Sequence, residues 1–352
     1  MEATQTKSTI LSIHNLVIKF KLRGKVLTAI RDISLNLYKG ESLAIVGESG
    51  SGKSVLVKSI MGLLDKNGFI DHGAIIYNDE DLAHFQTEKD WLKIRGKEVA
   101  MVTQDPMTSL NPLKTVGKQI EECVILHQGL RGKAAYEKTL QYLKDVGIYD
   151  VEKRYKQYPH EFSGGMRQRI VIAIAIACKP KILICDEPTT ALDVTIQAQI
   201  LQLLKNLQQQ YGLTTIYITH DLGVVAKVAD RIAVMYAGEI IEVGQSHEVF
   251  FNGKHPYTWA LLSSLPQLGT KGEELYSIKG TPPNLFKDIK GDAFAPRNPY
   301  ALNIDYEERP PFFKVSETHY AKTWLLHPKA PKVEPPHNLQ AFFEEGRHYT
   351  YE

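Results

Sequence analysis

The stretch Gly47-Glu-Ser-Gly-Ser-Gly-Lys-Ser54 matches the pattern G-x-x-x-x-G-K-[ST] at every fixed position. The apolar run at residues 42–46 predicts a buried strand before it, and residues 55–64 predict a helix after it. Glycines let backbone N–H groups approach phosphate oxygens, and the N-terminus of the helix adds partial positive charge there. The stretch therefore predicts a loop that binds nucleotide phosphates, in preference to a chance glycine-rich turn.

The side chains of this loop have separate expected roles. We expect Lys53 to reach the β- and γ-phosphates and the Ser54 hydroxyl to bind Mg²⁺. The predicted phosphate-binding residues are Gly47, Glu48, Ser49, Gly50, Ser51, Gly52, Lys53 and Ser54. The loop alone predicts nucleotide binding and no particular reaction.

The composition is that of a soluble globular protein, with 43% hydrophobic and 23% charged residues in 352. This length suggests about two domains. The 42 Lys plus Arg residues nearly balance the 40 Asp plus Glu residues, and no basic stripe is present, so we expect no nucleic-acid partner. The longest apolar run, residues 170–178, falls short of the ~20 residues of a membrane helix. The N-terminus has no visible secretory signal, and the three cysteines favour a reducing cytoplasm.

Alternating apolar and polar residues at 10–20 and 31–38 predict half-buried strands, and residues 73–77 are another strand candidate. We therefore expect an antiparallel β portion beside the nucleotide. Phe20 either stacks on the adenine base or is a core aromatic, and the sequence leaves both interpretations open.

The pattern in the middle of the chain predicts helices and parallel strands. Residues 97–104 carry a strand that ends on Gln104, residues 105–112 predict a loop, and residues 115–150 predict an all-helical insertion. Strands and helices then alternate, which predicts a mainly parallel α/β sheet. The expected elements are a helix from about 159 to 178, strands at 181–188 and 214–219, and helices at 195–209, 221–229 and 255–265. Paired prolines follow, which predict an irregular tail after a boundary near residues 245–255.

A phosphate loop that transfers the γ-phosphate needs carboxylates for Mg²⁺ and for water. Asp186 ends an apolar strand and is our candidate for holding the metal, while Glu187 faces differently and is the candidate to polarise the attacking water. The alternative, two surface acids at a strand end, is disfavoured by the loop upstream. Gln104 is expected to contact the metal or the water, and His220 the γ-phosphate, although each is weak evidence alone.

Residues Phe162-Ser-Gly-Gly-Met166 resemble the signature loop of the ATP-binding cassette (ABC) family, usually written LSGGQ. The phosphate loop, Gln104, this signature, ILICDEP, Ala191-Leu-Asp193 and Ile218-Thr-His220 occur in family order between about residues 10 and 245. The chain is identified as a member of that family. The resemblance implies an α/β fold: a P-loop NTPase core of ABC type with an antiparallel β subdomain and a helical subdomain.

The resemblance also implies domain bounds. We expect a nucleotide-binding domain at residues 1–248 with its helical subdomain at about 105–178, and a small irregular C-terminal domain at residues 249–352. The family further implies that two such domains pair head to tail and sandwich two ATP molecules. Ser163, Gly164 and Gly165 would then act in trans on the partner's γ-phosphate, with Asp193 at the seam between the two sites.

The same resemblance implies the remaining roles. Glu187, His220 and Gln104 are the expected catalytic residues, and Ser54, Gln104 and Asp186 the expected Mg²⁺ ligands. Phe20 and the phosphate loop complete the expected ATP-binding set. Because each site is shared, we expect an isolated chain to hydrolyse ATP weakly.

A narrower resemblance covers nearly the whole chain. Residues 104–112, HPYTWALL at 255–262 and a tail containing Gly-Thr-Pro-Pro at 280–283 and AFAPRNPYA at 293–301 are similar to the ATPases of oligopeptide, dipeptide and nickel importers. In that group the loop after the glutamine lies against the permease, so residues 105–112 are the expected coupling surface. An irregular solvent loop is the alternative.

The tail departs from that group at the positions of an iron–sulfur cluster. Many relatives have four cysteines here, whereas this chain has Asp292, Asn298, Asp305 and Thr323, and no cysteine after Cys185. Because such a cluster needs thiolate ligands, we predict that this chain holds none, and that packing of aromatics and prolines holds the tail.

The resemblance therefore implies an ATP- and Mg²⁺-dependent ATPase subunit that powers oligopeptide import from the cytoplasmic face of a membrane. The expected partners are a homologous second ATPase subunit in a heterodimer, two transmembrane permease subunits and, indirectly, an extracellular peptide-binding protein. Two alternatives stay open: import of dipeptides, nickel or another small solute, and a soluble ABC ATPase without a permease. A binding module without catalysis is disfavoured by the two carboxylates Asp186 and Glu187.

Overall fold

The computed structural model describes residues 8–190, 192–265 and 278–348. These residues form two compact units. The phosphate-loop unit contains residues 10–37 and 43–83 together with the described part of 219–352. The signature unit contains residues 8–9 and 38–42 together with the described part of 84–218. Each unit is described by itself below.

The phosphate-loop unit has an antiparallel sheet with strand order β2-β1-β4-β5. Its strands are β1 Thr9–Leu22, β2 Lys25–Tyr38, β4 Gly68–Tyr77 and β5 Glu80–Asp81. Ile13 of β1 lies opposite Ile75 of β4, and both are buried. The predicted antiparallel β portion is confirmed, because the alternating apolar residues form its buried face.

The same unit holds strands in the order β11-β12-β10-β9-β3. Their bounds are β3 Ser42–Val46, β9 Arg231–Tyr236, β10 Glu239–Gln245, β11 Phe313–Lys314 and β12 Tyr320–Ala321. The pair β3–β9 is parallel, whereas β10 runs antiparallel to both β9 and β12. Every residue of β3 is buried, as predicted for the strand before the phosphate loop. The sequence analysis did not assign β9 and β10.

Most helices in the described part of this unit are short. The α-helices are α1 Lys53–Ile60, α9 Leu222–Val225, α10 Ser246–Asn252, α11 Pro256–Ser263 and α12 His337–His348, and the 3₁₀ helices are η4 Ala295–Arg297, η5 Asn303–Tyr306 and η6 Trp324–Leu326. Helix α1 begins at Lys53 and ends at Ile60, so the expected helix at residues 55–64 is displaced toward the loop. Helix α9 is a single turn within the longer helix expected at 221–229.

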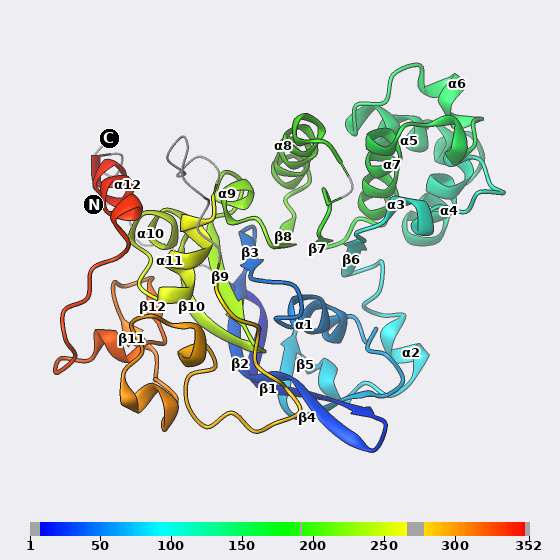
Figure 1. Ribbon diagram of the computed structural model, residues 1–352. Coiled ribbons are helices and arrows are strands. Elements are labelled where there is room, and N and C mark those ends of the chain that lie inside the picture. The colour runs from blue at the N-terminus through cyan, green and yellow to red at the C-terminus, as the bar shows by residue number, and fades with distance from the viewer. Residues whose placement is uncertain (1–7, 191, 266–277, 349–352) are drawn as a thin grey trace. The chain divides into compact units, whose positions relative to one another are not determined.

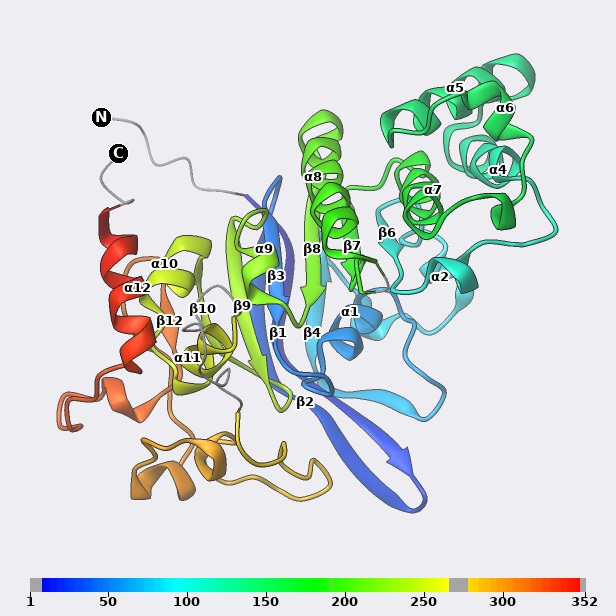
Figure 2. The same cartoon turned by 45° about the horizontal axis from the view of Figure 1, so that its top comes forward.

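Helix α12 corrects the expectation of an irregular tail. Phe342 packs its ring against Phe250 and Phe251, and Leu339 is fully buried. Figures 1 and 2 both show α12 beside α10, which carries those two rings. The apolar face of α12 is therefore covered by a helix distant in sequence, which a local reading of the tail does not show.

The signature unit contains a parallel sheet with strand order β8-β7-β6. Its strands are β6 Val99–Val102, β7 Ile182–Asp186 and β8 Thr214–Thr219. Its helices are α2 Glu88–Trp91, α3 Pro106–Ser109, α4 Val116–Gln128, α5 Gly132–Asp145, α6 Val151–Tyr155, α7 Gly164–Ala177 and α8 Val194–Tyr211, with η2 Pro159–Glu161; η1 Leu82–His84 lies at the start of this part of the chain. All residues of β7 and β8 are buried, which confirms the parallel α/β pattern.

Helices α4 to α7 gather into one bundle (Figure 1). Ile120 and Val124 of α4, Leu143 of α5 and Ile170 of α7 are fully buried. The helical insertion predicted at residues 115–150 is therefore confirmed. The predicted loop at 105–112 is wrong in one respect, since it contains the one-turn helix α3. Asp105 caps this helix by accepting a hydrogen bond from the Met107 N–H.

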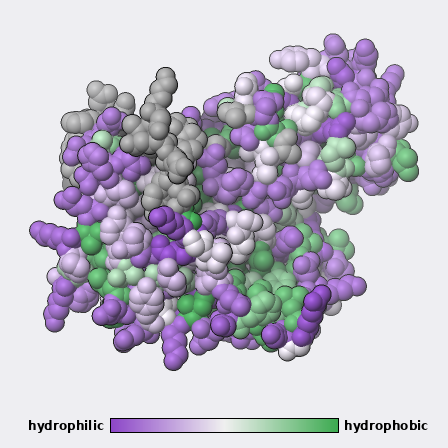
Figure 3. All heavy atoms as spheres, viewed as in Figure 1, coloured by the Kyte–Doolittle hydropathy of each residue, from purple (hydrophilic) through white to green (hydrophobic). Residues whose placement is uncertain are grey.

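Figure 3 shows mainly hydrophilic residues over the face of the molecule drawn there. Within the described residues, no helix combines the length and the apolar character needed to cross a bilayer.

Candidate functional site

The phosphate loop requires glycine at two positions for steric reasons. A Cβ atom on residue 47 would lie 2.1 Å from the Met235 carbonyl oxygen of β9. Gly52 has φ 103°, and a Cβ atom there would lie 2.9 Å from the Ala29 carbonyl oxygen of β2. Strands β9 and β2 therefore back the loop so closely that only glycine fits at these two positions.

Lys53 lies at the centre of the loop. Its side-chain nitrogen donates hydrogen bonds to the carbonyl oxygens of Gly47 at 2.7 Å and Glu48 at 2.9 Å, and only 5% of the residue is exposed. Ser51 Oγ lies 3.4 Å from the same nitrogen. Ser54 follows in the first turn of α1. The loop thus surrounds the ammonium group of Lys53, whose positive charge is expected to contact the phosphates.

The acidic residues occupy the signature unit. Asp186 is the last residue of β7 and is 8% exposed. Glu187 has φ 45°, a left-handed conformation, and its N–H donates to the Ile218 carbonyl oxygen at 2.9 Å. The extended strand therefore ends between the two carboxylates, which gives them different surroundings. A non-glycine residue in this conformation costs roughly 1–3 kcal/mol and is common at functional sites.

Gln104 and Glu187 are in direct contact. The Gln104 side-chain amide donates to Glu187 Oε2 at 3.1 Å, and Thr190 Oγ1 lies 2.8 Å from the same oxygen. The contact forms because β6 and β7 are parallel neighbours, with Val102 opposite Cys185. Thr190 was not predicted from the sequence, although its position three residues after Glu187 within a turn was a usable signal.

The signature stretch opens helix α7. Ser163 is its N-cap and accepts a hydrogen bond from the Met166 N–H at 3.4 Å. Ser163 and Gly164 are exposed, whereas Phe162 is 3% exposed and lies under the Arg154 guanidinium at 5.5 Å. The buried phenylalanine therefore anchors a helix start whose first residues are exposed.

Gly165 lets α7 approach α8, because a Cβ atom there would lie 2.9 Å from Cγ2 of Ile196. Asp193, expected at the seam between two sites, caps α8 by accepting a hydrogen bond from the Ile196 N–H at 3.0 Å, and it is exposed. Ala191 lies outside the described residues. His220 follows β8 and is exposed.

Phe20 is 9% exposed, and its ring lies against Gly68 of β4, where a Cβ atom would meet Cε1 at 2.5 Å. This burial fits the core-aromatic interpretation, and stacking on adenine stays a prediction. The expected site residues thus fall into two groups. The phosphate loop, Phe20 and His220 belong to the phosphate-loop unit, and the others belong to the signature unit.

Four buried polar residues occupy the tail positions singled out for an iron–sulfur cluster. Each accepts a hydrogen bond from a nearby backbone N–H: Phe294 to Asp292 at 2.9 Å, Tyr300 to Asn298 at 2.9 Å, Leu302 to Asp305 at 2.7 Å and Leu325 to Thr323 at 3.3 Å. None of the four is a thiolate, so these residues do not fit such a cluster. They stabilise the turns of the tail instead.

Asp292 also faces a buried histidine. Its Oδ2 lies 3.9 Å from Nε2 of His255, whose side chain is fully buried. Burial, together with the Asp305 carboxylate, raises the pKa of Asp292 to about 7. Burial lowers the pKa of His255 to about 4. The interior of the phosphate-loop unit therefore contains groups whose charge depends on pH.

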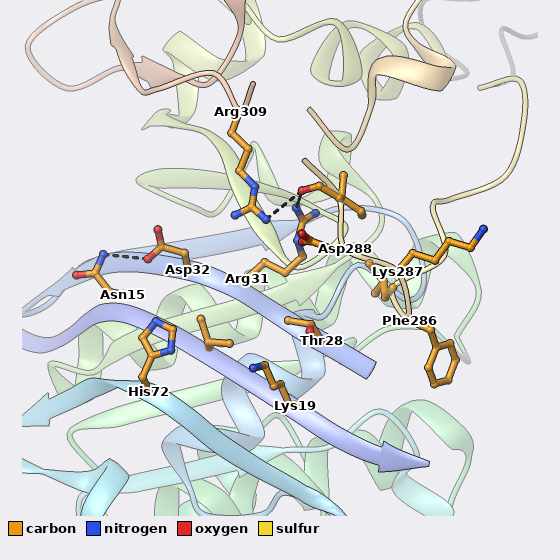
Figure 4. A pocket seen from close by; sticks show the side chains of 13 residues that line it. Asn15, Lys19, Thr28, Arg31, Asp32, His72, Phe286, Lys287, Asp288 and Arg309 are labelled. Atoms are coloured by element: carbon orange, nitrogen blue, oxygen red, sulfur yellow. Dashed lines mark hydrogen bonds between the residues drawn. The ribbon is translucent and has the colours of Figure 1, made fainter. Parts of the chain in front are cut away.

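A pocket of about 590 Å³ lies over the antiparallel sheet (Figure 4). Its walls come from β1, β2 and β4 and from the tail segment at residues 285–289. The Ile289 carbonyl oxygen accepts hydrogen bonds from Arg31 and Arg309, both at 3.2 Å. Charges of both signs line the pocket, among them Lys19 and Asp32. The pocket shows that the tail packs against the antiparallel sheet of the phosphate-loop unit.

Two family models match the chain. The model described as ABC transporter covers residues 30–190, which include the phosphate loop, Gln104, the signature and both carboxylates. The model described as oligopeptide/dipeptide transporter, C-terminal region, covers residues 241–304.

Several curated relatives match over almost their full length. The oligopeptide transport ATP-binding protein AmiE of Streptococcus pneumoniae serotype 4 is 60% identical over 333 residues, covering 95% of this chain and 94% of the relative. The oligopeptide transport ATP-binding protein OppD of Bacillus subtilis is 56% identical, covering 94% and 93%. The dipeptide transport ATP-binding protein DppD of Lactococcus lactis is 53% identical, covering 94% and 95%.

Solved structures agree with this grouping. A dimeric post-hydrolysis state of the ATP-binding cassette MJ0796, bound to ADP and Pi, has a TM-score of 0.60 and 28% identity and covers 67% of this chain. The structure of cbiO1 from Clostridium perfringens, part of the ABC transporter complex cbiONQ, has the same TM-score and identity and covers 70%. Both comparisons confirm the predicted α/β ABC fold. The chain therefore belongs to the ABC transporter family, as an ATP-hydrolysing subunit of the group that carries the oligopeptide/dipeptide transporter C-terminal region.

Proposed function

We propose that this chain hydrolyses ATP to power the import of oligopeptides through a membrane permease. The observation that carries the proposal is the 60% identity to AmiE, an oligopeptide transport ATP-binding protein, over 95% of the chain. The match includes the tail as well as the ATPase motifs, so the resemblance is not limited to the part common to all ABC ATPases. A peripheral position on the cytoplasmic face of the membrane follows from this function.

We assign separate roles in hydrolysis to the predicted residues. Lys53 balances charge on the β- and γ-phosphates, and Glu187, held by Gln104 and Thr190, accepts a proton from the attacking water. His220 orients the γ-phosphate. These groups supply positioning and charge, which are the main protein contributions to phosphoryl transfer.

The oxygen ligands expected for Mg²⁺ are of a suitable kind. Ser54 offers a hydroxyl, Gln104 an amide oxygen and Asp186 a carboxylate, and Mg²⁺ prefers such hard oxygen donors. When bound with ATP, Mg²⁺ neutralises charge on the phosphates.

We propose that ATP is closed over by a homologous second ATPase subunit in a heterodimer. Support comes from Ser163 and Gly164, which are exposed at the start of α7. Asp193 is also exposed, at the start of α8, and we place it at the seam between the two sites. The dimeric state of the related MJ0796 cassette is in keeping with this arrangement.

Two transmembrane permease subunits are the proposed partners of residues 105–112. Met107 in this segment is 61% exposed, and Leu113 directly after it is 86% exposed, so an interface here would cover apolar side chains. A peptide-binding protein outside the cell would act through the permease. We also propose that the tail holds no iron–sulfur cluster, and stoichiometric iron and sulfide in anaerobically purified protein would contradict this.

Dipeptides are the second candidate cargo, because the dipeptide transport protein of Lactococcus lactis is 53% identical over 94% of the chain. The test is to purify the transporter from solubilised membranes with this chain as bait and to reconstitute it in vesicles. We expect a permease and a second ATPase to co-purify, and labelled oligopeptides to enter the vesicles with ATP. Uptake of only dipeptides or nickel would overturn the cargo, and co-purification with ribosomes instead would overturn the transport function.

A further inference from the structure

The C-terminal extension, defined as residues 249–352, reaches the phosphate loop through Tyr257. The Glu48 N–H donates a hydrogen bond to the Tyr257 hydroxyl at 2.7 Å. Tyr257 is fully buried in α11, and its ring packs against Tyr236 at 4.6 Å and Phe294 at 5.3 Å. His255 caps this helix by accepting the Tyr257 N–H at 3.0 Å. The start of α11 thus holds a hydroxyl group rigidly behind the loop.

A second residue of the extension, Arg297, binds the side chain of the same loop residue. Its guanidinium makes two hydrogen bonds to the Glu48 carboxylate, Nη1 to Oε2 at 2.6 Å and Nη2 to Oε1 at 3.0 Å. The Arg297 side chain is 4% exposed and that of Glu48 is 26% exposed. Paired, charge-assisted hydrogen bonds of this kind fix orientation as well as distance.

The Arg297 guanidinium also forms hydrogen bonds to neighbouring elements. Nη1 donates to the Tyr236 hydroxyl at 3.2 Å, Nε donates to the Lys279 carbonyl oxygen at 3.0 Å, and Nη2 donates to that of Ile278 at 3.3 Å. Burial opposes the charge of Arg297, but the hydrogen bonds to Glu48 and Tyr236 raise its pKa. Arg297 therefore stays charged and links the loop, the end of β9 and the tail.

The tail segment that Arg297 holds continues along the loop. Pro282, Pro283 and Leu285 line a small cavity of about 60 Å³ together with residues 48–51 of the loop. The Leu285 carbonyl oxygen accepts the Thr28 N–H of β2 at 3.2 Å. This segment therefore runs from Arg297 past the phosphate loop to the antiparallel sheet.

Glu48 is consequently held at each of its polar groups. Its N–H donates a hydrogen bond to the Tyr257 hydroxyl, its carboxylate is bound by Arg297, and its carbonyl oxygen accepts a hydrogen bond from Lys53 at 2.9 Å. When Lys53 instead binds the phosphates of ATP, the contacts from Tyr257 and Arg297 remain. They come from the extension, and they restrain a loop whose glycines make it costly to order.

We propose that Arg297 is a positioning residue for ATP, which orders the phosphate loop through Glu48 and makes the C-terminal extension part of the nucleotide site. This inference depends on the ATP-binding role of the loop. A loop ordered in advance binds its ligand more tightly, because less conformational entropy is lost on binding.

The test measures equilibrium binding of a fluorescent ATP analogue to the full-length chain. We expect Arg297→Ala to weaken binding about 10-fold or more and Arg297→Lys to weaken it less, since lysine keeps the charge but loses the paired geometry. In the reconstituted transporter KM for ATP should rise with little change in kcat, the split expected for lost binding. The matched control is Arg309→Ala, an extension arginine with 41% exposed side chain, which should leave the affinity unchanged.

A double-mutant cycle separates positioning from general loss of structure. If Arg297 acts through Glu48, then Arg297→Gln should change affinity little in a Glu48→Gln background. Additive effects of the two changes, or wild-type affinity in Arg297→Ala, would overturn the inference. If Arg297→Ala does not fold, Arg297→Lys and the cycle decide the question. Failure of the wild-type chain to bind the analogue would instead contradict the ATP-binding role of the loop.

Discussion

Two glycine-rich stretches of this chain each open a helix, and their surroundings differ. Residues 47–54 lead into α1, and at Gly47 and Gly52 a Cβ atom would lie within 3 Å of carbonyl oxygens of β9 and β2, while Tyr257 and Arg297 hold Glu48. Residues 163–165 open α7 with Ser163 and Gly164 exposed and with the serine as their own cap. Both stretches place backbone N–H groups at the start of a helix. Other parts of the chain support residues 47–54, whereas the start of α7 is exposed.

The difference indicates a division of labour between chains. A loop that is restrained from behind can bind phosphate without help, whereas an exposed helix start is suited to a ligand brought by a partner. We therefore expect changes at the first stretch to affect binding by the chain alone, and changes at the second to affect only the assembled ATPase. The following predictions test that contrast.

The largest effect is expected for Glu187→Gln in the assembled transporter. Loss of the carboxylate removes the group that polarises water, so hydrolysis should fall about 100-fold or more. ATP binding should persist and should trap an ATP-bound dimer, which size-exclusion chromatography with ATP would detect. Near-normal turnover of this variant would remove Glu187 from the mechanism.

Gly47→Ala should have the next largest effect. The added Cβ atom would lie 2.1 Å from the Met235 carbonyl oxygen, so the loop must shift away from β9. We expect ATP affinity to fall about 100-fold, a change that calorimetry can measure. Gly50→Ala is the comparison, because its Cβ atom would have no neighbour within 4 Å and only its φ of 80° is strained. Equal losses in the two variants would show that contact with β9 is unimportant.

Ser163→Ala should have a smaller effect, and only in the assembly. The change removes a hydroxyl that caps α7 and that we assign to the partner's γ-phosphate, so hydrolysis by the transporter should fall about 10-fold. Losing the cap should also lower stability by about 1 kcal/mol. Thr87→Ala removes the cap of α2 in the same unit and controls for that loss, with stability compared by thermal unfolding. Unchanged hydrolysis by Ser163→Ala would leave the signature stretch without a catalytic role.

The smallest expected effect is the pH dependence of stability that comes from Asp292, which is buried in the phosphate-loop unit. Asp292 has a pKa of about 7 in the folded chain, above its ordinary value, so the folded state binds this proton more tightly. That stabilisation is complete below about pH 4 and is lost as pH rises toward 7.

Asp292→Asn should therefore gain stability relative to the wild type between pH 5 and 8, by more than about 1 kcal/mol. Its amide oxygen can still accept the Phe294 N–H. Urea unfolding at both pH values is the measurement, and a stability difference that does not change with pH would contradict the assignment. Asn298→Ala, also a buried cap in the tail, serves as a control without a titrating group.

Local patterns in the sequence predicted the local parts of the site. The glycine spacing at residues 47–54 and the apolar runs around it were enough to predict β3, the loop and α1. Asp105 followed by proline was a readable cap signal for α3, and it was overlooked. The contact between Gln104 and Glu187 required knowing that β6 and β7 are neighbours, which single strands do not reveal.

Local sequence patterns could not predict the contacts of Glu48. Tyr257 and Arg297 lie more than two hundred residues away along the chain, and their motifs were noted only as family resemblances. Helix α12 was missed for a related reason, since the rings that cover Phe342 belong to α10. In each case a long-range packing partner, and not local propensity, determines the structure.

The most direct test compares the two glycine-rich stretches in the isolated full-length chain. Equilibrium titration with a fluorescent ATP analogue would be carried out on the wild type, Gly47→Ala and Ser163→Ala. The account predicts that Ser163→Ala binds like the wild type and that Gly47→Ala loses affinity about 100-fold. Equal loss of affinity in both variants would contradict it, because the signature stretch would then serve the nucleotide of its own chain.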